Sequence, residues 1–352
     1  MIALNSQTIV FTAPGRAELL PVEVPRPEAD QILVRLAFST VSSGTERANL
    51  AGDPNVSIAS RDGAVHFPRY LGYSSSGTVV ETGAQVASVQ PGDRVAVSWG
   101  RHSQYLLLGE NNVHKIGDNV SIEEAAAALI GTFPLAAVRK CRLEIGEPAV
   151  VMGLGILGLI GVQLLRAAGA VPVIAVDPVE RQRQRALHFG ADWALNPYEE
   201  GFIQKVRSLT GGGAKVAVEV TGAAQALDQV LDCMAPLGRV ALLGCTRRSD
   251  FAIDYYHKVH GPGISLIGAH TLARPRTESS PGLWTDRDDI STLLHLLEGG
   301  RISWEKLAER RCSPLEAPAV YRELLESPSF PITQFDWTVL EGDPLRKEGK
   351  SL

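Results

Sequence analysis

The stretch from residue 148 to residue 177 constrains the fold of this chain most strongly. An apolar run, Pro148–Met152, leads into three glycines spaced GxGxxG, and a helical pattern and a second apolar run follow. Gly153 lets the chain turn sharply out of a strand, Gly155 lets the backbone approach a pyrophosphate, and Gly158 lets the helix pack closely on the sheet. The layout predicts a dinucleotide site.

The residues that follow the glycines predict how the dinucleotide is held. Ile156 and Leu157 open a helix whose free N–H groups and positive dipole end point at the phosphates. Asp177 ends the next strand, nineteen residues after Gly158, where a carboxylate accepts hydrogen bonds from a ribose 2′-OH and favours NAD(H). Arg181 and Arg183 are close enough in sequence to leave NADP(H) open.

The apolar character of this stretch also raises the alternative of a membrane span. Residues 149–165 carry no charge, but 17 residues is the short limit for a span, and the run is interrupted by four glycines and Gln163. The strand-then-helix pattern explains the stretch better, so we expect no span here.

Composition excludes several classes of protein. The net charge of −5, without a dense Lys/Arg block, argues against a nucleic-acid surface. The N-terminus lacks the basic and long apolar segments of a signal peptide, so a cytoplasmic location is the default expectation. The cysteines are scattered without a CxxC pair, which indicates neither a disulfide framework nor a zinc ribbon: Cys141, Cys233, Cys245 and Cys312.

The chain divides into two patterns. Up to about residue 120, many short strands separated by Pro/Gly turns indicate a compact, barrel-like β domain, and Ser121 to Glu124 read as a capping box that opens a helix. From Pro148 onward, strands alternate with helices, which predicts a parallel, doubly wound sheet. We expect domains at 1–129, completed by 272–352, and at 130–271.

Four motifs together resemble those of the medium-chain dehydrogenase/reductase superfamily, whose best-known members are the alcohol dehydrogenases. They are Gly72-Tyr73…Gly77-x-Val-Val-Glu-x-Gly83, Pro91-Gly-Asp-Arg-Val95, Gly153-x-Gly-x-x-Gly158 and Val218-x-Val-x-Gly222. The resemblance covers nearly the whole chain. It implies an α/β fold, with an N-terminal GroES-like β-barrel domain and a Rossmann domain with a doubly wound parallel sheet.

The chain departs from this family at the metal ligands. Zinc-dependent members carry Cys-Gly-Thr-Asp and Gly-His-Glu, where this chain has Ser43-Gly-Thr-Glu46 and Gly72-Tyr73-Ser74, and the third ligand falls near Leu129. The four-cysteine structural lobe is absent between Trp99 and His102. Catalytic zinc needs three protein ligands, so we expect no zinc here and regard a "zinc-binding" label as inherited from the fold.

Without a metal, a hydrogen-bond donor and proton relay must handle the substrate oxygen. The replaced ligand positions make Ser43 and Tyr73 the candidates, with simple space filling as the alternative. Glu46 is a candidate base, or else a structural ion-pair partner of Arg47 or Arg69. His102 and His270 are further candidates, each with a purely structural alternative.

The family resemblance also places residues along the cofactor groove. Thr221, Gly222, Gly244 and Cys245 follow the fourth and fifth strands of the predicted sheet, and Ala269 follows the sixth. Ligands of such sheets bind at the carboxyl ends of the strands. In the family, dimers form through the sheet edge, here expected at Ile264–Ile267, so we expect a homodimer or homotetramer.

Three functions stay open at this point. The first is a zinc-independent, NAD(H)-dependent dehydrogenase of a secondary alcohol, polyol or matching carbonyl. The second is an NADPH-dependent quinone or enoyl reductase, against which Asp177 and the basic insertion Arg274–Arg287 argue, since that insertion suggests a polar or anionic substrate. The third is a nucleotide-binding sensor or structural protein without catalysis. A family branch with a similar pattern includes a pigment-biosynthesis dehydrogenase, which leaves a large substrate open.

Overall fold

The computed structural model describes residues 4–56, 65–247 and 250–340. The chain forms two compact units: unit 1 comprises Met1–Ile130 and Ile290–Leu352, and unit 2 comprises Gly131–Asp289. The chain crosses between them inside two helices, α3 (Ala128–Lys140) and α8 (Asp286–Glu298). Within the described ranges no helix is both long and apolar enough to cross a membrane.

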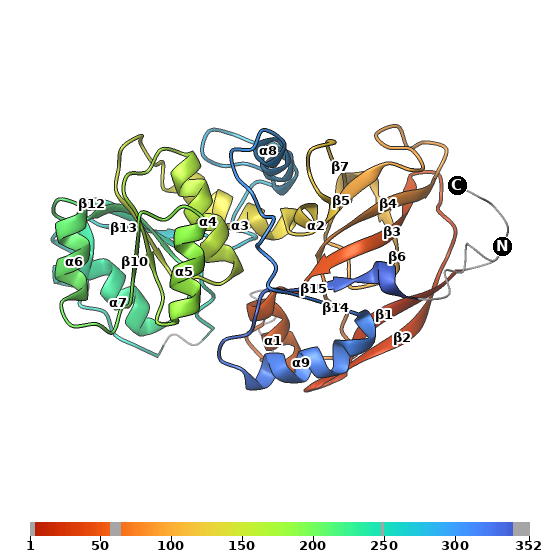
Figure 1. Ribbon diagram of the computed structural model, residues 1–352, viewed down its shortest axis with the longest axis horizontal. Coiled ribbons are helices and arrows are strands. Elements are labelled where there is room, and N and C mark those ends of the chain that lie inside the picture. The colour runs from red at the N-terminus through yellow and green to blue at the C-terminus, as the bar shows by residue number, and fades with distance from the viewer. Residues whose placement is uncertain (1–3, 57–64, 248–249, 341–352) are drawn as a thin grey trace. The chain divides into compact units, whose positions relative to one another are not determined.

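Unit 1 is built mainly of antiparallel strands (Figure 1). A seven-stranded sheet has the order β14-β15-β3-β4-β5-β7, with β6 also paired to β3, and β1 and β2 form a separate hairpin. The strands of unit 1 are β1 (Leu4–Ala13), β2 (Arg16–Val24), β3 (Gln31–Thr40), β4 (Ser74–Thr82), β5 (Arg94–Ser98), β6 (Tyr105–Gly109), β7 (Val113–Lys115), β14 (Arg310–Cys312) and β15 (Thr333–Asp336). Its helical segments are α1 (Ser43–Ala51), η1 (Glu110–Asn112), α2 (Ile122–Ala125), η3 (Pro314–Glu316), α9 (Ala317–Glu326) and η4 (Trp337–Val339).

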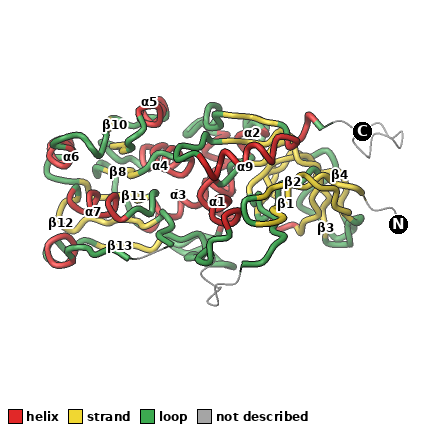
Figure 2. Tube along the Cα trace, turned by 90° about the horizontal axis from the view of Figure 1, so that it is seen from below, coloured by secondary structure: helices red, strands yellow, loops and turns green. Residues whose placement is uncertain are grey.

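Helices α1 and α9 lie side by side although they are far apart in the sequence, as Figures 1 and 2 both show. The Arg47 guanidinium on α1 donates a hydrogen bond of 2.8 Å to the carbonyl of Ser327, directly after α9. Apolar side chains of α9 join the main core of this unit, including Val320 and Leu324, both buried. This packing places the N-terminus of α1, where candidate site residues lie, against the returning C-terminal segment.

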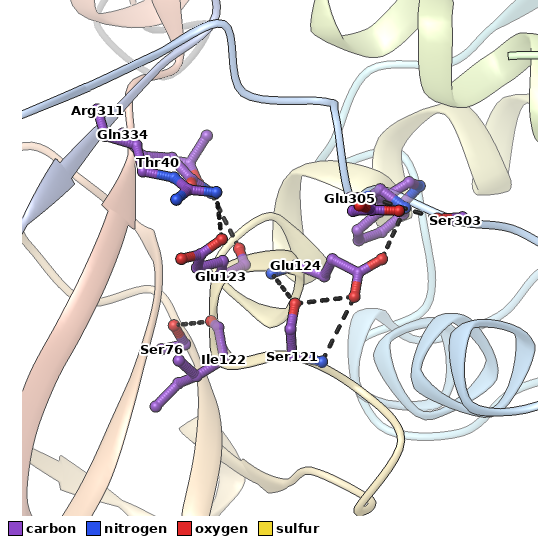
Figure 3. A network of polar contacts seen from close by, with 11 residues as sticks. Thr40, Ser76, Ser121, Ile122, Glu123, Glu124, Ser303, Glu305, Arg311 and Gln334 are labelled. Carbon is purple, nitrogen blue, oxygen red and sulfur yellow. Dashed lines mark hydrogen bonds and ion pairs between the residues drawn. The ribbon is translucent and has the colours of Figure 1, made fainter. Parts of the chain in front are cut away.

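The predicted capping box at α2 is confirmed. The Ser121 hydroxyl accepts from the Glu124 N–H at 3.1 Å, and Ser121 in turn donates to the Glu124 carboxylate. The same short helix holds segments that are distant in sequence. The Gln334 amide donates to the Glu123 carbonyl (Figure 3), and the Trp304 N–H donates to the Glu124 carboxylate. Helix α2 therefore fastens the returning chain to the β domain.

Unit 2 is a parallel sheet in the order β10-β9-β8-β11-β12-β13 (Figure 2). Its strands are β8 (Ala149–Met152), β9 (Val173–Val176), β10 (Trp193–Leu195), β11 (Ala214–Glu219), β12 (Met234–Leu242) and β13 (Ser265–Gly268). The connecting helical segments are α4 (Ile156–Ala167), α5 (Glu180–His188), α6 (Phe202–Leu209), α7 (Ala224–Asp232) and η2 (Tyr256–His260). The order reverses between β8 and β11, which is the switch point where such folds bind ligands.

The return of the chain to unit 1 differs from the sequence-based boundary at residue 272, because residues 272–289 pack in unit 2. The Arg274 guanidinium donates to the carbonyl of Thr132 at 3.0 Å and pairs with Asp289, which also pairs with Arg139 at 2.8 Å. The Asp289 side chain is fully buried. These contacts give Arg274 a structural partner, so it does not serve as the free cation for a substrate that the sequence suggested.

Strand β6 begins only at Tyr105, because His102 turns inward to side-chain partners. Strand β14 carries no apolar pattern in the sequence, since its three residues include Arg310 and Arg311.

Candidate functional site

The glycine turn between β8 and α4 has the geometry of a phosphate cradle. Gly153 has φ of +97°, and a Cβ there would lie 2.6 Å from the Thr221 side chain. A Cβ on Gly158 would lie 1.9 Å from the Gly153 carbonyl oxygen, so close packing of α4 requires this glycine. A Cβ on Gly155 would meet no atom within 4 Å. Packing therefore does not demand Gly155, whose open side suits an approaching pyrophosphate.

Asp177 follows β9, and its carboxylate holds the glycine turn. Its carboxylate accepts from the Leu154 N–H at 2.9 Å and from the Val179 N–H at 2.8 Å. A carboxylate has about four lone-pair sites, so both oxygens retain capacity for ribose hydroxyls. Arg183 is occupied by the backbone carbonyls of Asp177 and Pro178 and by Glu180.

Arg181, the other cation considered for a 2′-phosphate, is exposed on α5. Ile156 and Leu157 begin α4 directly after Gly155, whose backbone forms the helix N-cap. The N–H groups of this first turn have no partner within the helix and point out of its N-terminus. The residues present therefore fit a dinucleotide phosphate.

A buried carboxylate shapes the turn after β11, and sequence reasoning missed it. Glu219 accepts from the Thr221 N–H at 2.7 Å, from the Thr221 hydroxyl and from the Gly222 N–H at 3.1 Å. The pKa of Glu219 is raised above its usual value, because the effect of burial exceeds the opposite effect of these hydrogen bonds. A Cβ on Gly244 would lie 2.1 Å from the Gly222 nitrogen. Both glycines therefore allow the chain segments after β11 and β12 to meet.

The remaining candidates of unit 2 lie after β12 and β13. Cys245 is exposed and Ala269 is buried, with the Ala269 N–H bonded to the Leu242 carbonyl. His270 accepts a hydrogen bond of 3.2 Å from the Leu272 N–H at Nδ1. Burial and the charges of Arg247 and Lys140 lower the pKa of His270, which favours a neutral imidazole.

In unit 1, the structure connects Tyr73 to Ser42, the neighbour of the predicted Ser43. The Tyr73 hydroxyl donates to Ser42 Oγ at 2.5 Å, and its ring lies 5.8 Å from that of Trp99. Ser42 is the N-cap of α1, whereas Ser43 is the first helical residue. Ser42 makes no side-chain capping bond, so no local capping pattern marks it, and its contact with Tyr73 is visible only in the structure.

Glu46 and His102, both proposed from the sequence, lie together in the interior of unit 1. His102 Nε2 is 3.2 Å from a Glu46 oxygen, and the Tyr321 hydroxyl donates to the same carboxylate at 2.6 Å. Glu46 also accepts from the Ser42 N–H at 2.9 Å. The side chains of Glu46 and His102 are 0% and 1% exposed. Neither Arg47 nor Arg69 pairs with Glu46, because both donate elsewhere.

Both ring nitrogens of His102 have polar partners. The Trp337 indole N–H donates to Ser39 Oγ at 2.8 Å, and Ser39 Oγ lies 2.7 Å from His102 Nδ1. His102 Nε2 faces the Glu46 carboxylate, so the imidazole bridges Ser39 and Glu46. Burial, together with the Glu46 carboxylate, raises the pKa of Tyr321 well above its usual value.

These buried contacts favour the structural alternative that the sequence left open for Glu46 and His102. A group that must exchange protons with a substrate has to be within hydrogen-bond reach of it. Both side chains are closed off by Tyr321, Phe335 and Ser39, and His102 packs edge-on to Phe335 at 5.3 Å. Glu46 holds the Ser42 N–H, and His102 holds Glu46.

The residues at the family's zinc-ligand positions do not fit zinc. Ser43 and Tyr73 offer neutral hydroxyls, and Leu129 is a hydrocarbon with 1% exposure in the core of unit 1. Zinc takes thiolate, imidazole and carboxylate ligands. Across residues 4–56, 65–247 and 250–340, no group of three or more His, Cys, Asp or Glu side chains is placed to hold a metal ion.

The chain matches two protein families. Residues 28–142 match the alcohol dehydrogenase GroES-like domain, and residues 157–280 match the zinc-binding dehydrogenase family. It is 30% identical over 301 residues to the L-threonine 3-dehydrogenase of Thermococcus kodakarensis, covering 76% of this chain and 83% of that protein. It is 25% identical over 337 residues to the D-guloside 3-dehydrogenase of Escherichia coli K12, covering 90% and 95%.

Solved structures share the fold at lower identity. The 2R,3R-butanediol dehydrogenase of Bacillus subtilis superposes with a TM-score of 0.78 at 20% identity, covering 94% of this chain and 99% of that one. A protein from Sinorhizobium meliloti 1021 bound to NADP also superposes with a TM-score of 0.78, at 21% identity, covering 95% of this chain and 99% of that one. An alcohol dehydrogenase from E. coli CFT073 complexed with NADH superposes with a TM-score of 0.78 at 17% identity, covering 95% of this chain and 100% of that one.

Proposed function

The chain belongs to the medium-chain dehydrogenase/reductase superfamily of alcohol dehydrogenase-like, NAD(P)-dependent oxidoreductases, and from this premise we propose that it oxidises a secondary alcohol or polyol, or reduces the matching carbonyl, without zinc. Its relatives named above act on threonine, a guloside and butanediol, which are small hydroxylated molecules. A substrate of this chemical class is therefore the natural first choice.

Unit 2 supports NAD(H) as the cofactor. The bound nicotinamide would supply or accept the hydride. The open side of Gly155 and the N-terminus of α4 would hold the pyrophosphate, and the Asp177 carboxylate would accept from the ribose hydroxyls. The negative charge of Asp177 disfavours a 2′-phosphate, which supports NAD(H) over NADP(H).

The single observation that carries the zinc-free proposal is the hydrogen bond from Tyr73 to Ser42. Oxidation of an alcohol requires that its hydroxyl lose a proton, and reduction of a carbonyl requires that its oxygen gain one. In the reducing direction, Tyr73 Oη would give its proton to the substrate oxygen and take the Ser42 hydroxyl proton in its place, and oxidation would run the same transfers in reverse. The Tyr73 hydroxyl, at one of the family's zinc-ligand positions, and the neighbouring Ser42 hydroxyl thus offer the proton transfer that the reaction needs.

The buried groups behind Ser42 support positioning and not proton transfer. Ser42 reaches Glu46 through its backbone N–H, which does not exchange a proton during a reaction cycle. The protein groups of the relay therefore end at Ser42 Oγ, and because Ser42 is only half-buried the proton passes between it and solvent. Glu46, in turn fixed by Tyr321 and His102, keeps the N-terminus of α1 in place, so that Ser42 stays within reach of Tyr73.

The proposal is tested by following NADH formation from a panel of secondary alcohols and polyols. Tyr73→Phe should lower kcat/KM by about 10²- to 10³-fold, the usual contribution of one acid–base group, with NADH affinity unchanged. Tyr70→Phe is the matched control. Tyr70 is 44% exposed, so this variant should have the turnover of the wild type.

Three outcomes would contradict the proposal. Wild-type turnover by Tyr73→Phe would remove Tyr73 from the chemistry. Turnover of quinones or enoyl substrates with NADPH, and none of alcohols, would favour the reductase alternative. Tight NADH binding without turnover of any substrate would favour a nucleotide-binding sensor.

A further inference from the structure

Two segments of unit 1 that are distant in sequence carry the hydroxyls proposed to act on the substrate. Ser42 is the N-cap of α1, and Tyr73 lies one residue before β4. The family's zinc-ligand positions fall on both segments, at Ser43 and Tyr73, so a metal bound there would also join the segments. Since neither residue fits zinc, the two segments need another cross-link.

His102 contacts the segment that leads to Tyr73. Its backbone N–H donates a hydrogen bond of 2.7 Å to the Leu71 carbonyl, and its own carbonyl accepts from the Ile9 N–H on β1 at 2.9 Å. Gly72 has φ of +102°, and a Cβ there would lie 2.3 Å from His102 Cγ. The imidazole therefore lies directly against the Gly72 backbone and fixes the chain immediately before Tyr73.

The same imidazole reaches the segment that carries Ser42. His102 Nε2 lies 3.2 Å from one oxygen of Glu46 and 3.3 Å from the other. Glu46 belongs to the first turn of α1, and it accepts from the Ser42 N–H at 2.9 Å. One side chain thus holds the Tyr73 segment through Gly72 and the Ser42 segment through Glu46.

The surroundings of this pair hold it in one position. Ser39 Oγ lies 2.7 Å from His102 Nδ1, and the Tyr321 hydroxyl donates to Glu46 at 2.6 Å. The side chains of His102 and Glu46 are almost completely buried. Polar groups that are satisfied by one another in the interior form a rigid network. The pair is therefore stiff enough to serve as a cross-link.

From these contacts we propose that the buried pair of His102 and Glu46 joins the two segments in place of a metal, and thereby sets the position of Tyr73 relative to Ser42. His102 is a positioning residue, since it acts through Gly72 and Glu46. The value of this position for catalysis rests on the proposed function, whereas the cross-link itself does not depend on turnover.

Two variants separate the hydrogen bonds of His102 from its bulk. His102→Phe keeps a planar ring against Gly72 but cannot bond to Glu46. His102→Gln offers an amide N–H to Glu46 and is the conservative variant, which also serves if His102→Phe does not fold. Ser103→Ala is the matched control, because Ser103 is buried next to His102 and its hydroxyl contacts hydroxyls of β1.

Nitration by tetranitromethane measures the access to Tyr73 without any substrate. Trypsin releases Tyr70 and Tyr73 in one peptide, residues 70–94, whose fragment ions report each tyrosine separately. We expect nitration of Tyr73 to rise severalfold in His102→Phe, because Ser42 no longer holds its hydroxyl, and to rise less in His102→Gln. Ser103→Ala should match the wild type, and the exposed Tyr70 should react equally in all four proteins.

Turnover provides the second measurement. A displacement of about 1 Å in a reacting group can lower the rate by about 10²-fold. We therefore expect His102→Phe to lower kcat by about 10- to 100-fold with KM and NADH affinity close to those of the wild type. His102→Gln should recover part of the loss, and Ser103→Ala should keep the wild-type kcat.

Three results would overturn the proposal. The first is equal nitration of Tyr73 in His102→Phe and Ser103→Ala. The second is a wild-type kcat in His102→Phe. The third is a rise in Tyr73 nitration when the wild type is treated with a chelator, since a metal would then join the segments. Nitration needs no turnover, so a wild type that oxidises no alcohol would contradict the proposed activity while nitration still decides the cross-link.

Discussion

Asp177 combines two tasks that sequence patterns assign to separate residues. Its carboxylate accepts the N–H of Leu154 inside the glycine turn, and it is also the acid expected to face the cofactor ribose. Substitution by alanine would disturb both tasks together. Asparagine keeps an acceptor oxygen for the turn and removes only the charge, so it isolates the effect on cofactor choice.

We therefore expect Asp177→Asn to move the ratio of NADPH to NADH affinity toward NADPH by about tenfold or more, because a like-charge contact with a 2′-phosphate costs several kcal/mol. Fluorescence titration of both cofactors measures this ratio. Asp192→Asn is the control, since Asp192 also accepts a backbone N–H, that of Val173 at 2.7 Å, in another loop. An unchanged ratio in Asp177→Asn would contradict the assignment.

Tyr321 is the residue whose role depends most on the buried carboxylate of Glu46. Tyr321→Phe removes a donor to a buried charge, which should lower the free energy of unfolding by about 1.5–3 kcal/mol. Urea denaturation measures the loss, and the exposed Tyr70→Phe should change it by less than about 0.5 kcal/mol. Equal stability of the two variants would show that Glu46 does not need this partner.

Ser42 illustrates why site residues were harder to predict than the turn that holds them. Comparison with the family motif pointed to Ser43, one position later, because motif spacing gives a position but not a hydrogen bond. The contact of Glu46 with Tyr321 joins residues 275 positions apart, and no local pattern contains it. The burial of Glu46 and His102 favours a positioning role for both, which the sequence had left open beside a catalytic one.

At the scale of elements, local periodicity predicted strands and helices well. From Pro148 onward the sequence predicted strands that alternate with helices, and the elements of unit 2 from β8 to β13 follow this alternation. Strand β14 was missed because its pairing with β15, from Arg310 to Thr333, is a tertiary contact of a short polar segment.

Glu219, in the turn after β11, makes the stability of the chain depend on pH. Burial raises the pKa of Glu219 above its usual 4.5, so the folded chain retains a proton that the unfolded chain releases. The corresponding stability is present below 4.5 and is lost as the pH rises through the raised value.

Glu219→Gln should remove this contribution, because the amide oxygen still accepts from Thr221 but does not ionise. We expect the free energy of unfolding of the wild type to fall relative to that of Glu219→Gln as the pH rises above 4.5. Urea denaturation across this pH range provides the comparison. Parallel pH profiles of the two proteins would contradict the assigned pKa direction.

At the scale of the molecule, two compact units each have a separate apolar core. Unit 2 provides the residues that fit a dinucleotide, and unit 1 provides the hydroxyls of Tyr73 and Ser42. The sequence placed the return of the chain near residue 272. It could not show that Arg274 and Asp289 keep the following residues in unit 2, because an ion pair between them is a tertiary contact.

We propose that this member of a family known for zinc enzymes carries out its reaction without a metal. The most direct test measures the zinc content of the purified protein together with its rate of NADH formation from an alcohol before and after treatment with a chelator. We predict far less than one zinc per chain and an unchanged rate. One zinc per chain, with loss of the rate on its removal and recovery on its return, would contradict the account.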